Sequence, residues 1–89
     1  MLTNSGPAMT IVVHLFGPQA VLAGTRELPV DVPSGITAGD LLASLAATDA
    51  RLAPSLRYSR IAVNFEFVGA DAVVTEHDEV ALIGMLSGG

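Results

Sequence analysis

The stretch TIVVHLF, residues 10–16, decides the fold. It is rich in β-branched residues, and in an extended strand its side chains alternate between two faces. The two faces are both largely apolar: Ile11, Val13 and Leu15 lie on one, and Val12, His14 and Phe16 on the other. A strand of this kind belongs in the middle of a sheet, covered on both sides in at least one state of the protein.

Around this strand the sequence predicts one main helix and several shorter strands. The expected elements, in chain order, are one helical turn at 20–23, a strand at 27–32, a helix at 38–48, short strands at 60–64 and 66–68, and a last strand at 79–83. Thr37, with Asp40 three residues later, resembles a capping box at the helix start. Residues 52–59, which contain Pro54, are expected to be irregular. One helix covers only one face of a four- to five-stranded sheet, so the predicted fold class is an α+β roll.

The length and composition of the chain exclude several classes of protein. Its 89 residues suffice for one small hydrophobic core. The chain contains no cysteine, which excludes disulfides, thiolate zinc sites and cysteine nucleophiles. Its longest apolar run is far shorter than the ~20 residues that span a bilayer, and residues 1–8 lack the basic start of a signal peptide. We therefore expect no membrane contact and a cytoplasmic location, with a disordered lead-in at 1–8, a domain at 9–84 and a flexible tail at 85–89.

The acidic residues are concentrated in the last third of the chain. The net charge is −5, and from Ile61 onward the sequence contains Asp and Glu but no Lys or Arg. A nucleic-acid backbone would be repelled there, so no nucleic-acid partner is expected. Two explanations stay open: acidic turns that aid solubility, or a basic partner surface that receives the C-terminal end.

No set of residues in the chain resembles an active site of its own. His14 and His77 have no ligand-like spacing to each other or to a pair of carboxylates, so no metal site is expected. No Ser, His and Asp set is suggested, and the glycines form no phosphate loop. The sequence predicts no catalytic groups beyond the chain end.

The last two residues, Gly88 and Gly89, are the one feature with mechanistic content. Without Cβ atoms, an extended backbone can thread a channel too narrow for any other residue, and the terminal carboxylate stays unhindered. A carboxylate is a poor electrophile at neutral pH, so covalent chemistry there needs a partner enzyme that adenylates it. The other interpretation is a frayed C-terminus of small residues, which is common.

Several short motifs occur together in the chain over about residues 9–89. They are Phe16-Gly17, residues 37–42, Ile61-Ala62-Val63-Asn64, and residues 78–83 leading to Ser87-Gly88-Gly89. In order and spacing they resemble the β-grasp sulfur carriers, the family of the molybdopterin synthase small subunit and of the thiazole-synthesis carrier. Members often have two prolines after the last strand, where this chain has Gly84 and Met85. This departure implies a looser tail.

The resemblance implies a fold and a function. The fold is a β-grasp, ubiquitin-like roll with a mixed sheet. The Gly89 carboxylate is adenylated by an activating enzyme that uses ATP and Mg, becomes a thiocarboxylate, and enters a synthase large subunit on a tail formed by Leu86, Ser87 and Gly88. The sulfur then passes to a pterin precursor of molybdopterin. The chain itself binds no cofactor and is a sulfur-carrying subunit without catalytic groups.

Other functions stay open beside this one. The sulfur could go to thiazole, to a cysteine precursor or to tRNA. From a different class, the protein could be a ubiquitin-like binding module whose diglycine is never activated.

The partner surface is predicted from strand parity. If Val13 and Leu15 face the helix, Phe16 and Ile83 point to the opposite face, which has no helix to cover it. Phe67 joins them there, and Met85 and Leu86 extend the patch along the tail. Docked on a larger subunit, such a patch becomes the buried centre of an interface. The alternative is that these side chains fill a second small core under residues 52–59.

Overall fold

The computed structural model of the protein describes residues 8–84. Its elements along the chain are β1 (Ala8–His14), α1 (Gly17–Ala23), β2 (Glu27–Pro33), α2 (Ala38–Thr48), α3 (Ala53–Leu56), β3 (Ser59–Val63), β4 (Glu66–Phe67) and β5 (Val80–Gly84). The predictions for residues 1–7 and for the tail at 85–89 lie outside the described residues, whereas Ala8 already belongs to β1.

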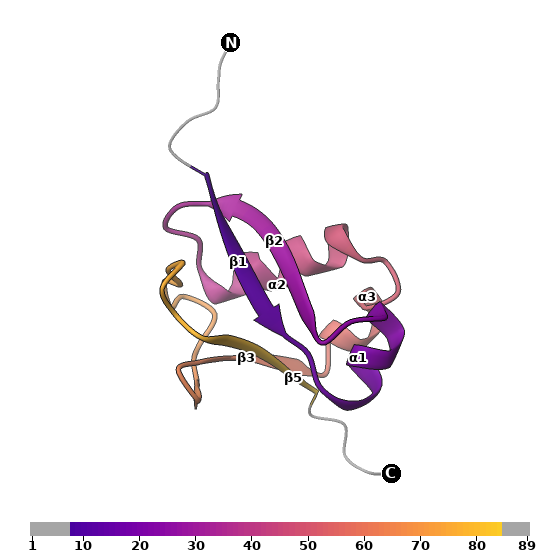
Figure 1. The fold of residues 1–89 in the computed structure, drawn as a ribbon. Helices are drawn as coiled ribbons and strands as arrows, with labels where there is room; N and C mark the ends of the chain where they lie inside the picture. Colours follow the sequence, from indigo (N-terminus) through magenta and orange to yellow (C-terminus); the bar gives the residue numbers. More distant parts are fainter. Residues whose placement is uncertain (1–7, 85–89) are drawn as a thin grey trace.

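The five strands form one mixed sheet in the order β2-β1-β5-β3-β4 (Figure 1). β1 runs antiparallel to β2 and parallel to β5, and β3 runs antiparallel to both β5 and β4. The prediction that the first strand lies inside the sheet is therefore confirmed. The predicted α+β roll with a sheet of four to five strands is confirmed as well.

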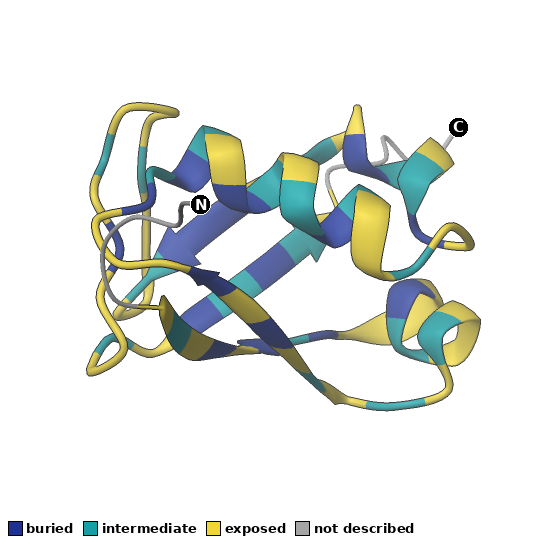
Figure 2. Cartoon of the chain, turned by 90° about the horizontal axis from the view of Figure 1, so that it is seen from above, coloured by how far each residue is buried: buried dark blue, intermediate teal, exposed yellow. Residues whose placement is uncertain are grey.

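The core lies between α2 and the face of the sheet that this helix covers (Figure 2). As parity predicted, Val13 and Leu15, which lies just past the end of β1, face the helix. Val80 and Leu82 of β5 face it as well, and all four are at most 1% exposed. From the helix, Leu41 and Leu45 are fully buried against them. α2 begins where the sequence predicted, because the Asp40 backbone N–H donates to Oγ1 of Thr37 at 3.2 Å and caps the first turn.

Two expected elements differ from the structure. β1 ends at His14, two residues earlier than expected, although Leu15 N–H still donates to the Arg26 carbonyl at 2.8 Å. The single turn expected at 20–23 is a seven-residue helix, α1, which starts at Gly17 because proline is tolerated in a first helical turn. Gly24 ends this helix, with the left-handed φ of 74° that glycine adopts readily.

The expectation of an irregular segment at 52–59 is wrong in part. It contains the short helix α3, and Pro54 stands in the first turn of that helix. A proline there removes no helical hydrogen bond, because the first N–H groups have no partner within the helix. Leu52 and Leu56 extend from this segment into the main core.

Candidate functional site

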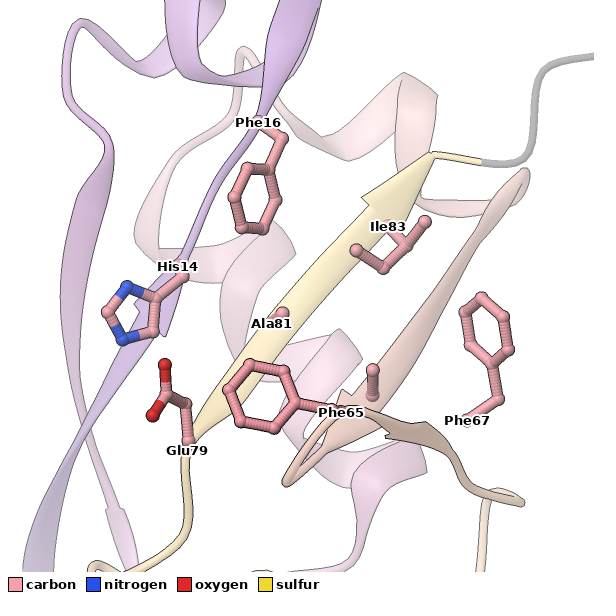
Figure 3. Close-up of a pocket in the computed structure, with 8 residues that line it drawn as sticks. His14, Phe16, Phe65, Phe67, Glu79, Ala81 and Ile83 are labelled. Atoms are coloured by element: carbon pink, nitrogen blue, oxygen red, sulfur yellow. The ribbon is translucent and has the colours of Figure 1, made fainter.

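The face of the sheet turned away from α2 carries an apolar groove of about 540 Å³. Strand parity builds it, because the cross-strand partners Ala62 and Ala81, and Ala62 and Phe67, share one side of the sheet. Figure 3 shows the side chains that line it, which are His14, Phe16, Ala62, Phe65, Phe67, Glu79, Ala81 and Ile83.

The groove brings together three of the five residues predicted for the partner surface. Phe16 is 55% exposed, Phe67 is 48% exposed, and Ile83 is partly buried between them on β5. The other two, Met85 and Leu86, lie outside the described residues. The alternative of a second core is wrong, because Phe16 and Phe67 are half exposed and Leu52 and Leu56 pack into the main core instead.

Sequence reasoning missed five of the eight residues that line the groove, which are His14, Ala62, Phe65, Glu79 and Ala81. Phe65 falls between the two predicted short strands and receives no role from the sequence. In the structure it lies at the tip of the β3–β4 turn and is 85% exposed. His14, for which the sequence indicates no functional role, lines the groove, and its Nδ1 lies 3.9 Å from Oε2 of Glu27. No local signal marks Phe65 in the sequence, because the two-residue loop follows only from the pairing of Val63 with Glu66.

One side of the groove is held by a cation–π contact. The guanidinium carbon of Arg60 lies 4.8 Å from the centroid of the Phe67 ring. Because β4 has only two residues and lies at the sheet edge, this contact helps to fix the ring against the open face.

A set of hydrogen bonds holds the β3–β4 turn against the start of β5. Asn64 donates through Nδ2 to Oδ1 of Asp78 at 3.0 Å, and its Oδ1 accepts from the Glu79 N–H at 2.9 Å. The Thr75 N–H donates to Oδ2 of Asp78 at 2.9 Å. The hydrogen bond from Thr75, followed by that from Asn64, holds the pKa of Asp78 below its ordinary value. We call this arrangement the Asn64–Asp78 clasp.

The clasp predicts an acid-sensitive contribution to stability. Since the pKa of Asp78 is lowered in the folded state, its contribution is fully present above the unfolded value and is lost as the pH falls below about 4. Asp78→Asn leaves one acceptor oxygen for the two donors Thr75 N–H and Asn64 Nδ2, so this variant should unfold at a lower temperature at pH 7 and lose less stability on acidification. Thermal unfolding from pH 7 to pH 2.5 measures both effects. The control Asp71→Asn removes the same charge outside the clasp, and equal pH profiles for Asp78→Asn and the unchanged protein would contradict the prediction.

The last strand ends beside a buried polar contact that joins three elements. Gln19, which is 6% exposed on α1, donates through Nε2 to Oγ of Ser55 at 3.0 Å and to Oγ of Ser59 at 2.8 Å. A Cβ at Gly84 would lie 3.4 Å from Oε1 of the same side chain. β5 therefore ends at the edge of the molecule that carries α1 and Phe16 (Figure 1).

The remaining predicted site residues follow this strand end. Leu86, Ser87, Gly88 and Gly89 lie outside the described residues. Within residues 8–84, no three His, Asp or Glu side chains are grouped so that they could hold a metal ion. In the same range, no helix has the length and apolar character needed to cross a membrane.

Comparison with known proteins assigns the family. Residues 13–89 match the ThiS family. The chain belongs to the ThiS family. A curated relative in Drosophila erecta, named molybdopterin synthase sulfur carrier subunit, is 39% identical over 92 residues, which cover 99% of this chain and all of the relative. The protein is accordingly a sulfur carrier of the ThiS type.

Solved structures agree with the fold of this ThiS family member. The crystal structure of SAMP1 from Haloferax volcanii has a TM-score of 0.75 and 27% identity, covering 91% of this chain and all of that chain. A complex of subunits 1 and 2 of the molybdopterin-converting factor from Helicobacter pylori contains a chain with a TM-score of 0.60 and 21% identity, with 91% of this chain and all of that chain covered. The predicted β-grasp fold is confirmed.

Proposed function

We propose that the protein is the sulfur-carrying small subunit of a molybdopterin synthase, with the sulfur held as a thiocarboxylate on Gly89. The observation that carries this proposal is the position of the apolar groove beside the end of β5. Five residues follow Gly84, the last of them Gly89, so a fully extended tail would reach about 17 Å beyond the strand. A large subunit bound on the groove thus lies within reach of the chain end.

The chemistry starts at the Gly89 carboxylate. One of its oxygens attacks the α-phosphate of ATP, pyrophosphate leaves, and an acyl adenylate forms. Sulfur at the oxidation level of sulfide then attacks the acyl carbon, AMP leaves, and a thiocarboxylate remains. In the synthase the thiocarboxylate sulfur bonds to a carbon of the pterin precursor as an oxygen substituent leaves that carbon, and water then cleaves the acyl–sulfur bond to restore the carboxylate. Both ATP and Mg belong to the activating enzyme, and we place the sequence of steps in the cytoplasm.

In this proposal residues 8–84 provide the surface that binds the large subunit. Phe16, Phe67 and Ile83 offer the apolar centre of an interface, with Met85 continuing it along the tail. The groove also contains Glu79, and Glu27 lies beside His14. Acidic groups at an apolar interface favour a partner with basic residues around its docking surface. Gly88, preceded by Leu86 and Ser87, passes into the partner's channel because it carries no side chain.

The large subunit as partner is supported by two relatives. The Drosophila erecta protein is named as a molybdopterin synthase subunit, and the Helicobacter pylori chain was solved in complex with its second subunit. An ATP-dependent activating enzyme follows from the chemistry, because a free carboxylate does not react with a sulfur donor at neutral pH.

The acceptor of the sulfur is tested by reconstitution. The thiocarboxylated protein is mixed with a molybdopterin synthase large subunit and the pterin precursor, and in parallel with the thiazole-forming enzyme and its substrates. We expect sulfur loss from the carrier and dithiolene formation only in the first mixture. Thiazole formation without dithiolene would assign the carrier to the thiazole branch, and transfer in neither mixture would reject both acceptors.

A further inference from the structure

The turn between β3 and β4 has an unusual residue at its second position. Asn64 and Phe65 are the two loop residues between the paired residues Val63 and Glu66, and both have positive φ, 52° and 71°. Two consecutive positive φ angles define the type I′ hairpin turn, whose preferred sequence is Asn-Gly. Asn64 fits the first position. A bulky aromatic residue at the second is a conformational outlier that glycine would occupy without strain.

Contacts among residues 8–84 do not compensate for this strain. Phe65 is 85% exposed, the highest value among the large apolar side chains that the structure describes. An aromatic ring this exposed gains little from packing, so both the backbone and the side chain of Phe65 are unfavourable in the isolated protein. Asn64, in contrast, is held on both sides by the Asn64–Asp78 clasp.

The side chain of Phe65 lies at the groove and does not point away from it. Phe65 lines the groove together with Phe16 and Ile83, and Figure 3 shows its ring over the open face of the sheet, between Glu79 and Phe67. The clasp fixes the turn at its base, so little conformational entropy remains to be lost when a partner covers the ring. Strained residues of this kind are concentrated at sites of binding and catalysis.

We propose that Phe65 is a binding anchor for the large subunit, retained in a strained turn where glycine would give a more stable fold. This inference rests on the function proposed above. The partner is expected to offer an apolar hollow that accepts the ring, bordered by a basic side chain facing Glu79. Phe65 lines the same groove as Phe16, Phe67 and Ile83, so the anchor enlarges that apolar surface.

Two variants separate strain from binding. Phe65→Gly removes the ring and relieves the strain, whereas Phe65→Ala removes the ring and keeps a Cβ at positive φ. We expect both to bind the large subunit about tenfold or more weakly, and Phe65→Gly to melt a few degrees above Phe65→Ala and no lower than the unchanged protein. Calorimetric titration and thermal unfolding measure the two quantities. Val21→Ala is the matched control, since Val21 is 80% exposed on α1 outside this groove, and its affinity should not change.

The outcomes distinguish this inference from the function on which it rests. Unchanged affinity in both Phe65 variants, with weaker binding by Phe16→Ala, overturns the anchor and leaves the proposed interface intact. Unchanged affinity in all three variants overturns the interface as well. If the unfolding temperature of Phe65→Gly is equal to or lower than that of Phe65→Ala, the turn is not strained. The proposal that Phe65 lowers folding stability in order to strengthen binding is then wrong.

Discussion

Deletion of Gly89 is expected to abolish sulfur transfer and to leave the unfolding temperature unchanged. The deletion moves the carboxylate back by about 3.5 Å along an extended chain, so it no longer reaches the adenylating site or the acceptor. The fold should not respond, because the buried core residues lie between Ile11 and Leu82. Thiocarboxylate formation measured by mass spectrometry, with thermal unfolding in parallel, tests both parts. Full activity in the shortened protein would reject the carrier function.

A bulky residue at Gly88 separates threading from the chemistry of the terminus. Gly88→Ile keeps the Gly89 carboxylate but adds a branched side chain to the tail. We expect its stability to stay within ~0.5 kcal/mol of the unchanged protein, and entry into the partner's channel to be blocked. Gly88→Ala is the milder companion and should lose less activity. Normal adenylation together with normal sulfur delivery by Gly88→Ile would show that no narrow channel is threaded.

The second large effect is expected at the groove. Phe16→Ala and Phe67→Ala should each weaken binding to the large subunit by about 1–3 kcal/mol, roughly 5- to 150-fold. Their exposed fractions, 55% and 48%, show that neither ring is a core residue, so folding stability should fall by much less than the 3–5 kcal/mol typical of a buried phenylalanine. Phe67→Ala also removes the ring that stacks on Arg60. Calorimetric titration with the large subunit and denaturant unfolding provide the two free energies.

The changes in binding affinity and in folding stability together decide whether Phe16 and Phe67 belong to an interface or to the core. Val21→Ala again serves as the control, because it shortens an exposed apolar side chain outside the groove. If Phe16→Ala and Phe67→Ala keep full affinity and lose several kcal/mol of folding stability, both rings stabilise the fold and the docking surface lies elsewhere.

Local patterns in the sequence predicted the central strands and the main helix. The alternation of residues 10–16 was sufficient because strand parity is a strict geometric rule, and the same rule put Phe16 and Ile83 on the open face. Thr37 marked the helix start because its side chain accepts a hydrogen bond from the backbone N–H of Asp40, only three residues later. These features depend on neighbours within a few positions in the chain.

Features that depend on pairing between distant segments were missed. Pro54 is a breaker in a strand or a helix interior but an acceptable first-turn residue, and only the packing of Leu52 and Leu56 into the core decides between these roles. The positive φ of Phe65 arises from the register of β3 with β4, in which Val63 pairs with Glu66. That register leaves two residues for the loop, and no local propensity of phenylalanine indicates it.

The most direct measurement is the intact mass of the protein after incubation with ATP, Mg, a sulfur source and the activating enzyme. A sulfur carrier gains the mass difference between sulfur and oxygen, and tandem fragmentation should locate that gain on Gly89. The same incubation without ATP should leave the mass unchanged. An unchanged mass in the complete mixture, under conditions in which an authentic carrier is converted by the same enzyme, would contradict the function proposed here.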